Sequence, residues 1–145
     1  MIRVALVEDD AAYREQLTGY LRQYEREQGE KFHLSVFTDG DEIVEGYKAV
    51  YDIILMDIEM QFMDGITAAE RIREYDSEVV IMFITNMPQY VMKGYLVDAL
   101  DYVLKPISYY AFSQKSMNER RYSIKKNGGH PAALFCCSDF LYGAY

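Results

Sequence analysis

Residues 2–10 form an apolar run that ends in three acids, Ile2-Arg3-Val4-Ala5-Leu6-Val7-Glu8-Asp9-Asp10. The side chains before the acids are nearly all apolar, which is typical of a parallel strand that is covered on both faces. The run is too short for a signal peptide or a membrane span, so we expect a protein that is not exported. In open parallel sheets the chemistry lies beyond the carboxyl ends of the strands, which makes the three acids candidate site residues.

The same kind of run recurs along the chain. After Arg3–Val7 come His33–Phe37, Ile53–Ile58, Val79–Thr85 and Tyr102–Leu104. Segments with helical spacing separate these runs, and strands that alternate with helices predict a parallel sheet joined by crossover helices. The sequence therefore predicts an α/β fold with a (βα)5 order.

The first two helices have recognisable boundaries. Tyrosines and leucines recur at helical spacing between Asp10, a suitable N-cap, and Gly29, a suitable C-terminal stop. Asp39-Gly40 predicts a turn, and a short amphipathic helix with Ile43, Val44 and Tyr47 is expected to follow it. The first crossover helix is thus the longer of the two.

Three more helices are expected further along the chain. Ile66, Ala68, Ala69 and Ile72 share one face of a helix that begins after Gly65. Pro88 suits the first turn of a helix that runs to about Val97, and a last helix is expected from about Tyr109 to Lys126.

The charge of the chain argues against a nucleic-acid-binding surface. The formal net charge is -8, and residues 1–106 hold 10 basic and 21 acidic side chains. An acidic body repels the phosphate backbone, so we expect no direct DNA binding by residues 1–106. The two cysteines, Cys136 and Cys137, are adjacent, which suits neither a structural bridge nor a metal pair. A reducing cytoplasm is the expected location.

The length of 145 residues fits one domain with a real core. We expect that domain to occupy residues 1–126. Residues 127–131 read as a turn or linker, and residues 132–145 form an apolar, aromatic segment that is too small to be a domain.

The strand ends bring one set of reactive groups to a single edge of the predicted sheet. They are Glu8 and Asp9, then Asp57, then Thr85 with Asn86, and finally Lys105. Carboxylates crowded there without a cation would repel one another and raise a pKa. Mg²⁺, or Mn²⁺ in its place, would relieve this repulsion, because hard divalent ions prefer oxygen ligands.

The same set of residues suits phosphoryl transfer. Asp57 can attack a phosphoryl group to form an acyl phosphate, and Lys105 can neutralise one of its oxygens. The Thr85 hydroxyl and the Asn86 N–H can donate to another oxygen. Each residue alone has a structural explanation, since an acid after a strand is usually a helix cap, as we expect of Asp10. Their joint position at one edge favours function.

Five motifs in this order resemble the response-regulator receiver domains of two-component systems. They are Val7-Glu8-Asp9-Asp10, Leu55-Met56-Asp57-Ile58, Met63-Asp64-Gly65, Ile84-Thr85-Asn86 and Asp101-Tyr102-Val103-Leu104-Lys105-Pro106. The resemblance covers about residues 2–126. Residues 90–105 look most like the receivers that are attached to LytTR-type DNA-binding domains.

The resemblance implies a flavodoxin-like, doubly wound sheet with the strand order 2-1-3-4-5. It also implies that Glu8, Asp9, Asp57 and the Glu59 carbonyl hold magnesium, and that Asp57 is phosphorylated by a sensor histidine kinase. Thr85 and Tyr102 would be the switch pair, although a plain core tyrosine fits Tyr102 equally well. Phosphorylation would favour a homodimer. Its interface would be the face of helix four, strand five and helix five, which are expected at residues 88–97, 102–104 and 109–126.

Such a protein is a phosphoacceptor that assists its own phosphorylation and dephosphorylation, and not an enzyme. It would control transcription only through a DNA-binding domain that residues 127–145 are too short to supply. The chain is then a fragment of a longer regulator, a stand-alone receiver or a chain with an altered end. Receivers usually have a proline where this chain has Gln61, which puts the rigidity of that loop in question.

Three other functions compete with this interpretation. A metal-dependent phosphohydrolase would use Asp57 as a transient nucleophile, but Glu59 is not followed by a catalytic pattern. A flavin-binding module needs Ser, Thr or Gly after the first strand, where this chain has acids. A degenerate receiver that acts only as a scaffold would not need the complete acidic cluster.

Overall fold

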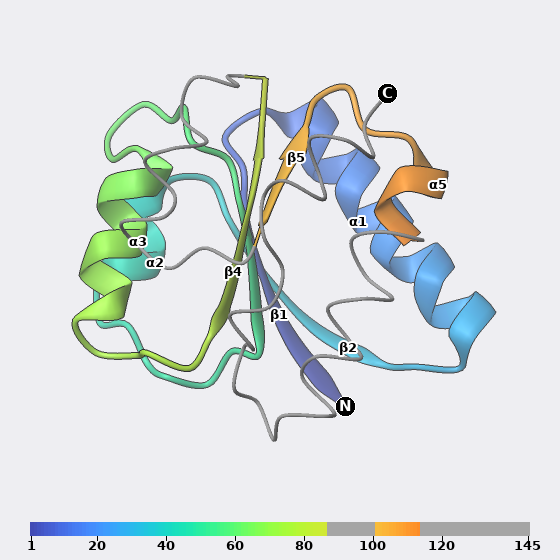
Figure 1. Ribbon diagram of the computed structural model, residues 1–145, viewed down its shortest axis with the longest axis horizontal. Helices are drawn as coiled ribbons and strands as arrows, with labels where there is room; N and C mark the ends of the chain where they lie inside the picture. The colour runs from blue at the N-terminus through green and yellow to red at the C-terminus, as the bar shows by residue number, and fades with distance from the viewer. Residues whose placement is uncertain (87–100, 114–145) are drawn as a thin grey trace.

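Five parallel strands form one sheet in the order β2-β1-β3-β4-β5, which confirms the expected fold class and strand order (Figure 1). The computed structural model describes residues 1–86 and 101–113. The strands are β1 (Ile2–Val7), β2 (Phe32–Phe37), β3 (Ile53–Met56), β4 (Val80–Thr85) and β5 (Asp101–Leu104). Each of the five predicted runs coincides with a strand to within two residues at either end.

Helices cover both faces of the sheet. Figure 1 shows α1 (Ala11–Gln28) and α5 (Tyr109–Ala111) on one side and α2 (Gly40–Val44) and α3 (Gly65–Arg73) on the other. The helix predicted from Pro88 to Val97 lies outside the described residues. So does the rest of the last predicted helix beyond Ser113.

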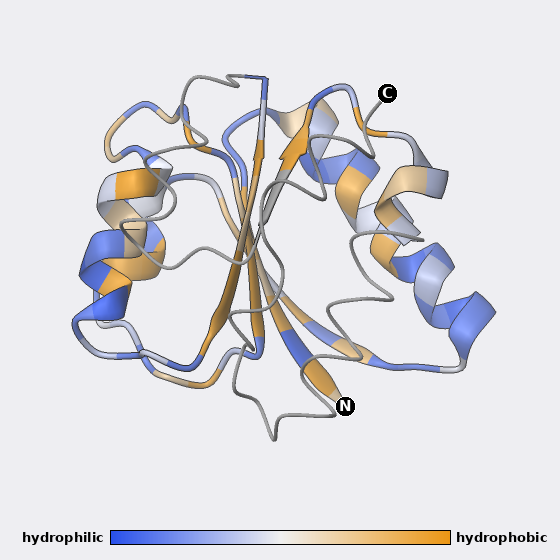
Figure 2. Cartoon of the chain, viewed as in Figure 1, coloured by the Kyte–Doolittle hydropathy of each residue, from blue (hydrophilic) through white to orange (hydrophobic). Residues whose placement is uncertain are grey.

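The core has two layers because side chains alternate across a strand. Val4 and Leu6 of β1 point into the layer under α1, whereas Ala5 and Val7 point into the layer under α3. Figure 2 shows the same arrangement, with apolar residues along the strands and polar residues on the outer sides of the helices. Apolar burial thus fixes the sheet in register, and the register places the strand ends side by side.

The caps of α1 lie where the sequence predicts them, and α3 has an N-cap that was not predicted. The Asp10 side chain accepts a hydrogen bond from the Tyr13 N–H at 3.0 Å, and Gly29 ends the helix with φ of 66°. Asp64 caps α3 by accepting from the Thr67 N–H at 2.8 Å. The expected N-cap role of Asp10 is therefore confirmed, and its carboxylate stabilises the start of α1.

Three expectations are wrong in detail. α2 ends at Val44, so Tyr47 lies outside it, because Gly46 adopts a left-handed φ of 63° and turns the chain away. Gly40 is the first residue of α2 and not part of a preceding turn. β2 lies at one edge of the sheet and its Val36 remains 47% exposed, so this strand is not covered on both faces as β1, β3 and β4 are.

Within residues 1–86 and 101–113, no helix has both the length and the apolar character needed to cross a lipid bilayer.

Candidate functional site

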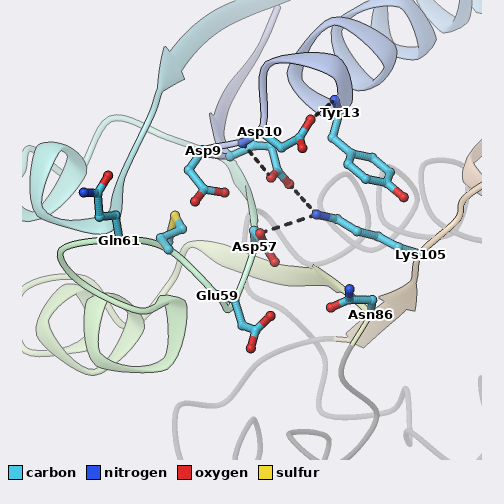
Figure 3. Close-up of a pocket in the computed structure, with 10 residues that line it drawn as sticks. Asp9, Asp10, Tyr13, Asp57, Glu59, Gln61, Asn86 and Lys105 are labelled. Atoms are coloured by element: carbon cyan, nitrogen blue, oxygen red, sulfur yellow. Dashed lines mark hydrogen bonds and ion pairs between the residues drawn. The ribbon is translucent and has the colours of Figure 1, made fainter.

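A polar pocket of about 410 Å³ opens at the carboxyl ends of the strands. Its walls come from the segments that follow β1, β3, β4 and β5, and they include Glu8, Asp57, Asn86 and Lys105 (Figure 3). The parallel register explains this meeting, because Val7 pairs with Met56 and Thr85 pairs with Leu104. The next residues along the chain therefore come out at one edge.

Three carboxylates converge in this pocket. Glu8, Asp9 and Asp57 each offer an oxygen, and these oxygens lie within 4.8 Å of one another. Glu8 and Asp57 are only 1% and 6% exposed, whereas Asp9 is exposed. Burial and the neighbouring charge of Asp57 raise the pKa of Glu8 to about 7. Burial also raises the pKa of Asp57, against the opposing charge of Lys105. The cluster holds more negative charge than its surroundings compensate.

Lys105 is the cation of the pocket. Its Nζ lies 3.0 Å from Glu8 Oε2 and 3.4 Å from Asp57 Oδ2. A dashed line in Figure 3 marks the contact with Asp57. Burial alone would lower the pKa of Lys105, but the two carboxylates raise it above its ordinary value. The ammonium group is therefore charged and is shared between two buried acids.

The donor set fits a hard divalent cation. Glu8 Oε2 is buried and, despite its ion pair with Lys105, accepts no hydrogen bond from any residue that the structure describes. A buried carboxylate oxygen with spare lone pairs beside two further carboxylates is a ligand set that Mg²⁺ accepts. Glu59 also lines the pocket, and Figure 3 shows its side chain pointing away from Asp57.

The remaining predicted site residues lie at the same edge. Thr85 ends β4 and is fully buried, and its carbonyl accepts from the Lys105 N–H at 2.8 Å. Asn86 follows it and lines the pocket. Tyr102 lies in β5 opposite Phe83, and its side chain lies outside the described part of the structure. Of the predicted switch pair, Thr85 is therefore placed as a buried residue, and Tyr102 is placed only by its backbone.

Arg14 was not predicted, although it supports the acidic ligands directly. Its guanidinium donates to the Glu8 carbonyl at 2.9 Å and to the Asp9 carbonyl at 3.0 Å. Its position in the first turns of a helix that follows the acids could have suggested this contact. The two hydrogen bonds fix the backbone from which both carboxylates project.

Asp39 is a second residue that sequence reasoning missed. Its carboxylate accepts from the N–H groups of Phe62 and Met63 at 2.9 and 2.8 Å. Burial raises the pKa of Asp39, but these and further backbone N–H groups outweigh it and hold the pKa below its ordinary value. The loop that carries Gln61 is therefore anchored by a buried acid and not by a proline.

Gly65 lets the start of α3 pack closely against the backbone of Asp57. A Cβ at position 65 would lie 2.2 Å from the Asp57 carbonyl oxygen, which is backbone and cannot rotate away. We expect Gly65→Ala to lower the free energy of unfolding by about 3 kcal/mol, the upper end of ordinary overpacking costs. The control is Gly19→Ala in α1, where nothing lies within 4 Å. That variant should gain about 0.5–1 kcal/mol. Equal urea midpoints for the two variants would contradict the close contact.

The raised pKa of Glu8 predicts how stability depends on pH. The group ordinarily titrates at 4.5 and in the folded protein at about 7. Its stabilising contribution is complete below pH 4.5 and is lost as pH rises through about 7, since the unfolded chain then releases the proton more readily. Thermal melts without divalent ions should show this decline, and Glu8→Gln should remove it. A wild-type profile that is flat between these pH values would show that Glu8 is not strained.

The sequence of this chain is similar to those of known proteins. The response regulator receiver domain family matches residues 4–115. The chain is 40% identical over 93 residues to the chemotaxis protein CheY of Treponema pallidum, covering 61% of each. It is 32% identical over 113 residues to the transcriptional regulatory protein RprY of Bacteroides fragilis, covering 74% of this chain and 44% of RprY. To the sensory transduction protein LytT of Bacillus subtilis it is 27% identical, covering 73% of this chain and 43% of LytT. The chain thus spans between 43% and 61% of these relatives.

Two solved structures are similar throughout the fold. One is the Saccharomyces cerevisiae co-crystal structure of the histidine phosphotransfer signaling protein Ypd1 and the receiver domain of the response regulator Ssk1. The match has 26% identity and a TM-score of 0.66, and it covers 79% of this chain and 85% of that chain. The other is the response regulator protein TrrA of Thermotoga maritima in complex with Mg²⁺-BeF, with 25% identity and a TM-score of 0.64. It covers 87% of this chain and 98% of that one.

Proposed function

Because the chain belongs to the response regulator receiver domain family, we propose that it acts as a phosphoacceptor in two-component signalling and carries the phosphoryl group on Asp57. The observation that supports this most is the contact of Asp57 with Lys105 at 3.4 Å inside a cluster of three carboxylates. A carboxylate nucleophile, a cation and further acids at the ends of parallel strands are what acyl phosphate formation requires.

In the proposed reaction, one Asp57 oxygen attacks the phosphorus of a phosphohistidine. The new O–P bond forms as the P–N bond breaks, and the departing imidazole takes up a proton. Lys105 lies where its ammonium can neutralise a phosphoryl oxygen, and the Asn86 N–H can donate to another. No general base is needed, because the attacking carboxylate is ionised once a bound cation offsets the cost of burying its charge.

Glu8, Asp9 and Asp57 would hold Mg²⁺, or Mn²⁺ in its place, with the Glu59 carbonyl as a further ligand. The bound ion supplies positive charge that offsets both the carboxylates and the incoming phosphoryl oxygens. The buried Oε2 of Glu8, with its spare lone pairs, supports this assignment. So does the likeness to TrrA, whose structure contains Mg²⁺-BeF.

The partner that fits this chemistry is a sensor histidine kinase or a phosphotransfer protein. The likeness to the receiver that forms a complex with Ypd1 supports it. Phosphorylation would then switch one face of the domain through Thr85 and Tyr102 and favour a homodimer. That face would be formed by β5 and by the helices predicted at residues 88–97 and 109–126. Similarity to RprY, a transcriptional regulatory protein, supports transcriptional control through a further domain. Similarity to LytT, a sensory transduction protein, favours a LytTR-type regulator as the finer assignment, and we place this function in the cytoplasm.

Intact mass spectrometry with a small-molecule phosphodonor tests the proposal. Wild-type protein with Mg²⁺ should gain one phosphoryl group that is stable enough to observe, and Asp57→Ala should gain none. Steady donor turnover without an adduct would instead favour a phosphohydrolase. Neither adduct nor turnover would favour a binding scaffold, and both of these results contradict a phosphoacceptor that is not an enzyme.

Asp9→Ala should separate the metal from the nucleophile. Asp9 is exposed, so its removal costs little stability, but it takes one of three carboxylates from the cluster. Loss of an outer-shell partner alone weakens metal binding by about 10–100-fold, so we expect loss of a ligand to weaken Mg²⁺ binding by about 100-fold or more. Titration calorimetry measures the affinity, and adduct formation at limiting Mg²⁺ should fail in parallel. An unchanged affinity would remove Asp9 from the ligand set.

A further inference from the structure

One side of α1 contacts the segment that carries Lys105. Tyr13, Tyr20 and Glu27 recur every seven residues, a spacing that places them along one side of a helix. The Tyr20 hydroxyl donates to the Ile107 carbonyl at 2.9 Å, and the Tyr109 hydroxyl donates to Glu27 at 2.6 Å. These contacts tie the chain that follows β5 to α1.

Tyr13 makes the contact nearest to the pocket. The centre of its ring lies 4.1 Å from Lys105 Nζ, within the range of a cation–π interaction. Figure 3 shows the ring beside the lysine, whose side chain extends from the end of β5 towards Asp57. The ammonium thus has carboxylates at 3.0 and 3.4 Å and an aromatic face as its neighbours.

These neighbours differ in what happens to them during the proposed reaction. Glu8 and Asp57 are also the proposed metal ligands, and a divalent cation held by them would repel the ammonium and offset much of their negative charge. The aromatic face carries no formal charge that a metal ion could claim. The ring contact is therefore the one that persists while the carboxylates are engaged.

We propose that Tyr13 is a positioning residue for Lys105. The face of the Tyr13 ring holds the Lys105 ammonium beside the phosphoryl site while the carboxylates bind a cation. This inference rests on the proposed phosphoacceptor function and deepens it. In this proposal Tyr13 acts only through Lys105.

Three variants test the role of the ring. Tyr13→Leu removes the aromatic face, Tyr13→Phe keeps it, and Tyr75→Leu is the matched control at a tyrosine that is 75% exposed. Adduct formation at saturating Mg²⁺ should slow by about 2- to 30-fold in Tyr13→Leu, the range that cation–π energies allow. It should stay close to wild type in the other two. In a Lys105→Ala background, Tyr13→Leu should have no further effect.

A spectroscopic measurement tests the contact without any phosphorylation. An aromatic face shifts nearby protons upfield, so the terminal methylene protons of Lys105 should resonate upfield in the NMR spectra of wild type and Tyr13→Phe. In Tyr13→Leu the shift should disappear, while Mg²⁺ affinity stays within about twofold, since no ligand is lost.

The outcomes separate this inference from the function on which it rests. If wild-type protein forms no adduct, the phosphoacceptor function fails, and the proton shifts still decide the contact. If the adduct forms and Tyr13→Leu matches wild type, only the role of Tyr13 is overturned. It is also overturned if Tyr13→Phe is as slow as Tyr13→Leu, or if Tyr13→Leu slows the Lys105→Ala protein to the same degree.

Discussion

Asp57→Asn will form no phosphoryl adduct, and without divalent ions it will unfold at a higher temperature than the wild type. The loss of the adduct follows because an amide is not a nucleophile for phosphorus under these conditions. The gain in stability follows because burial raises the pKa of Asp57, so its ionised form strains the folded state at neutral pH. An amide of the same shape removes that charge. It leaves Lys105 paired with Glu8 alone, a balanced pair at 3.0 Å.

Magnesium should reverse this order. The wild type gains stability from a cation that binds its folded form, whereas Asp57→Asn has lost one charged ligand and should gain less. Thermal melts of both proteins with and without Mg²⁺ measure the effect, and Asp52→Asn is a control at a carboxylate outside the cluster. A wild type that melts above Asp57→Asn in the absence of metal would show that the acids are not in conflict.

Lys105→Ala will have the opposite effect on stability. It takes away the ammonium that lies 3.0 and 3.4 Å from two buried carboxylates and leaves both without their cation. Breaking a buried ion pair by removing one partner costs about 3–5 kcal/mol, and protonation of Glu8 will offset part of that cost. The variant should still bind Mg²⁺, at least as tightly as the wild type, because a competing cation has gone.

Chemical unfolding with and without Mg²⁺ measures this cost. The difference between the two conditions should be larger for Lys105→Ala than for the wild type. Lys48→Ala, a lysine remote from the pocket, should leave both values unchanged. Adduct formation by Lys105→Ala should be slow even when Mg²⁺ is saturating, because one phosphoryl oxygen is left without its counter-charge. Full stability in the absence of metal would mean that Lys105 does not hold the acids together.

The strands and the edge that carries the site could be predicted because both depend on local patterns. Residues 80–84 of β4 are apolar throughout, and such a run can be buried only between two layers of helices. Once the strands are parallel, the residues after them must meet, which is why Glu8, Asp57 and Lys105 come together. Order along the chain was sufficient for this part of the site.

The supports of the site could not be read in the same way. Asp39 accepts a hydrogen bond from the Phe62 N–H, 23 residues further along the chain. Tyr13 contacts Lys105, although the two residues lie near opposite ends of the domain sequence. Neither contact leaves a periodic signal in the sequence. The first depends on how two loops pack, and the second on how α1 packs against the segment after β5. The extent of α2 was also missed, since Gly46 ends that region through its backbone conformation and not through a change in polarity.

Reductive trapping tests the central claim most directly. Borohydride reduces an acyl phosphate of aspartate to homoserine, so the wild-type protein should be treated with phosphodonor and Mg²⁺, reduced and digested, and its peptides sequenced by mass spectrometry. We predict homoserine at position 57 and at no other position, and only when Mg²⁺ is present. An acyl phosphate at Asp9 would give homoserine at position 9, and one at Glu8 would give 5-hydroxynorvaline, which is one carbon longer, so both differ from homoserine at position 57. Modification there, or an unmodified position 57, would contradict the account.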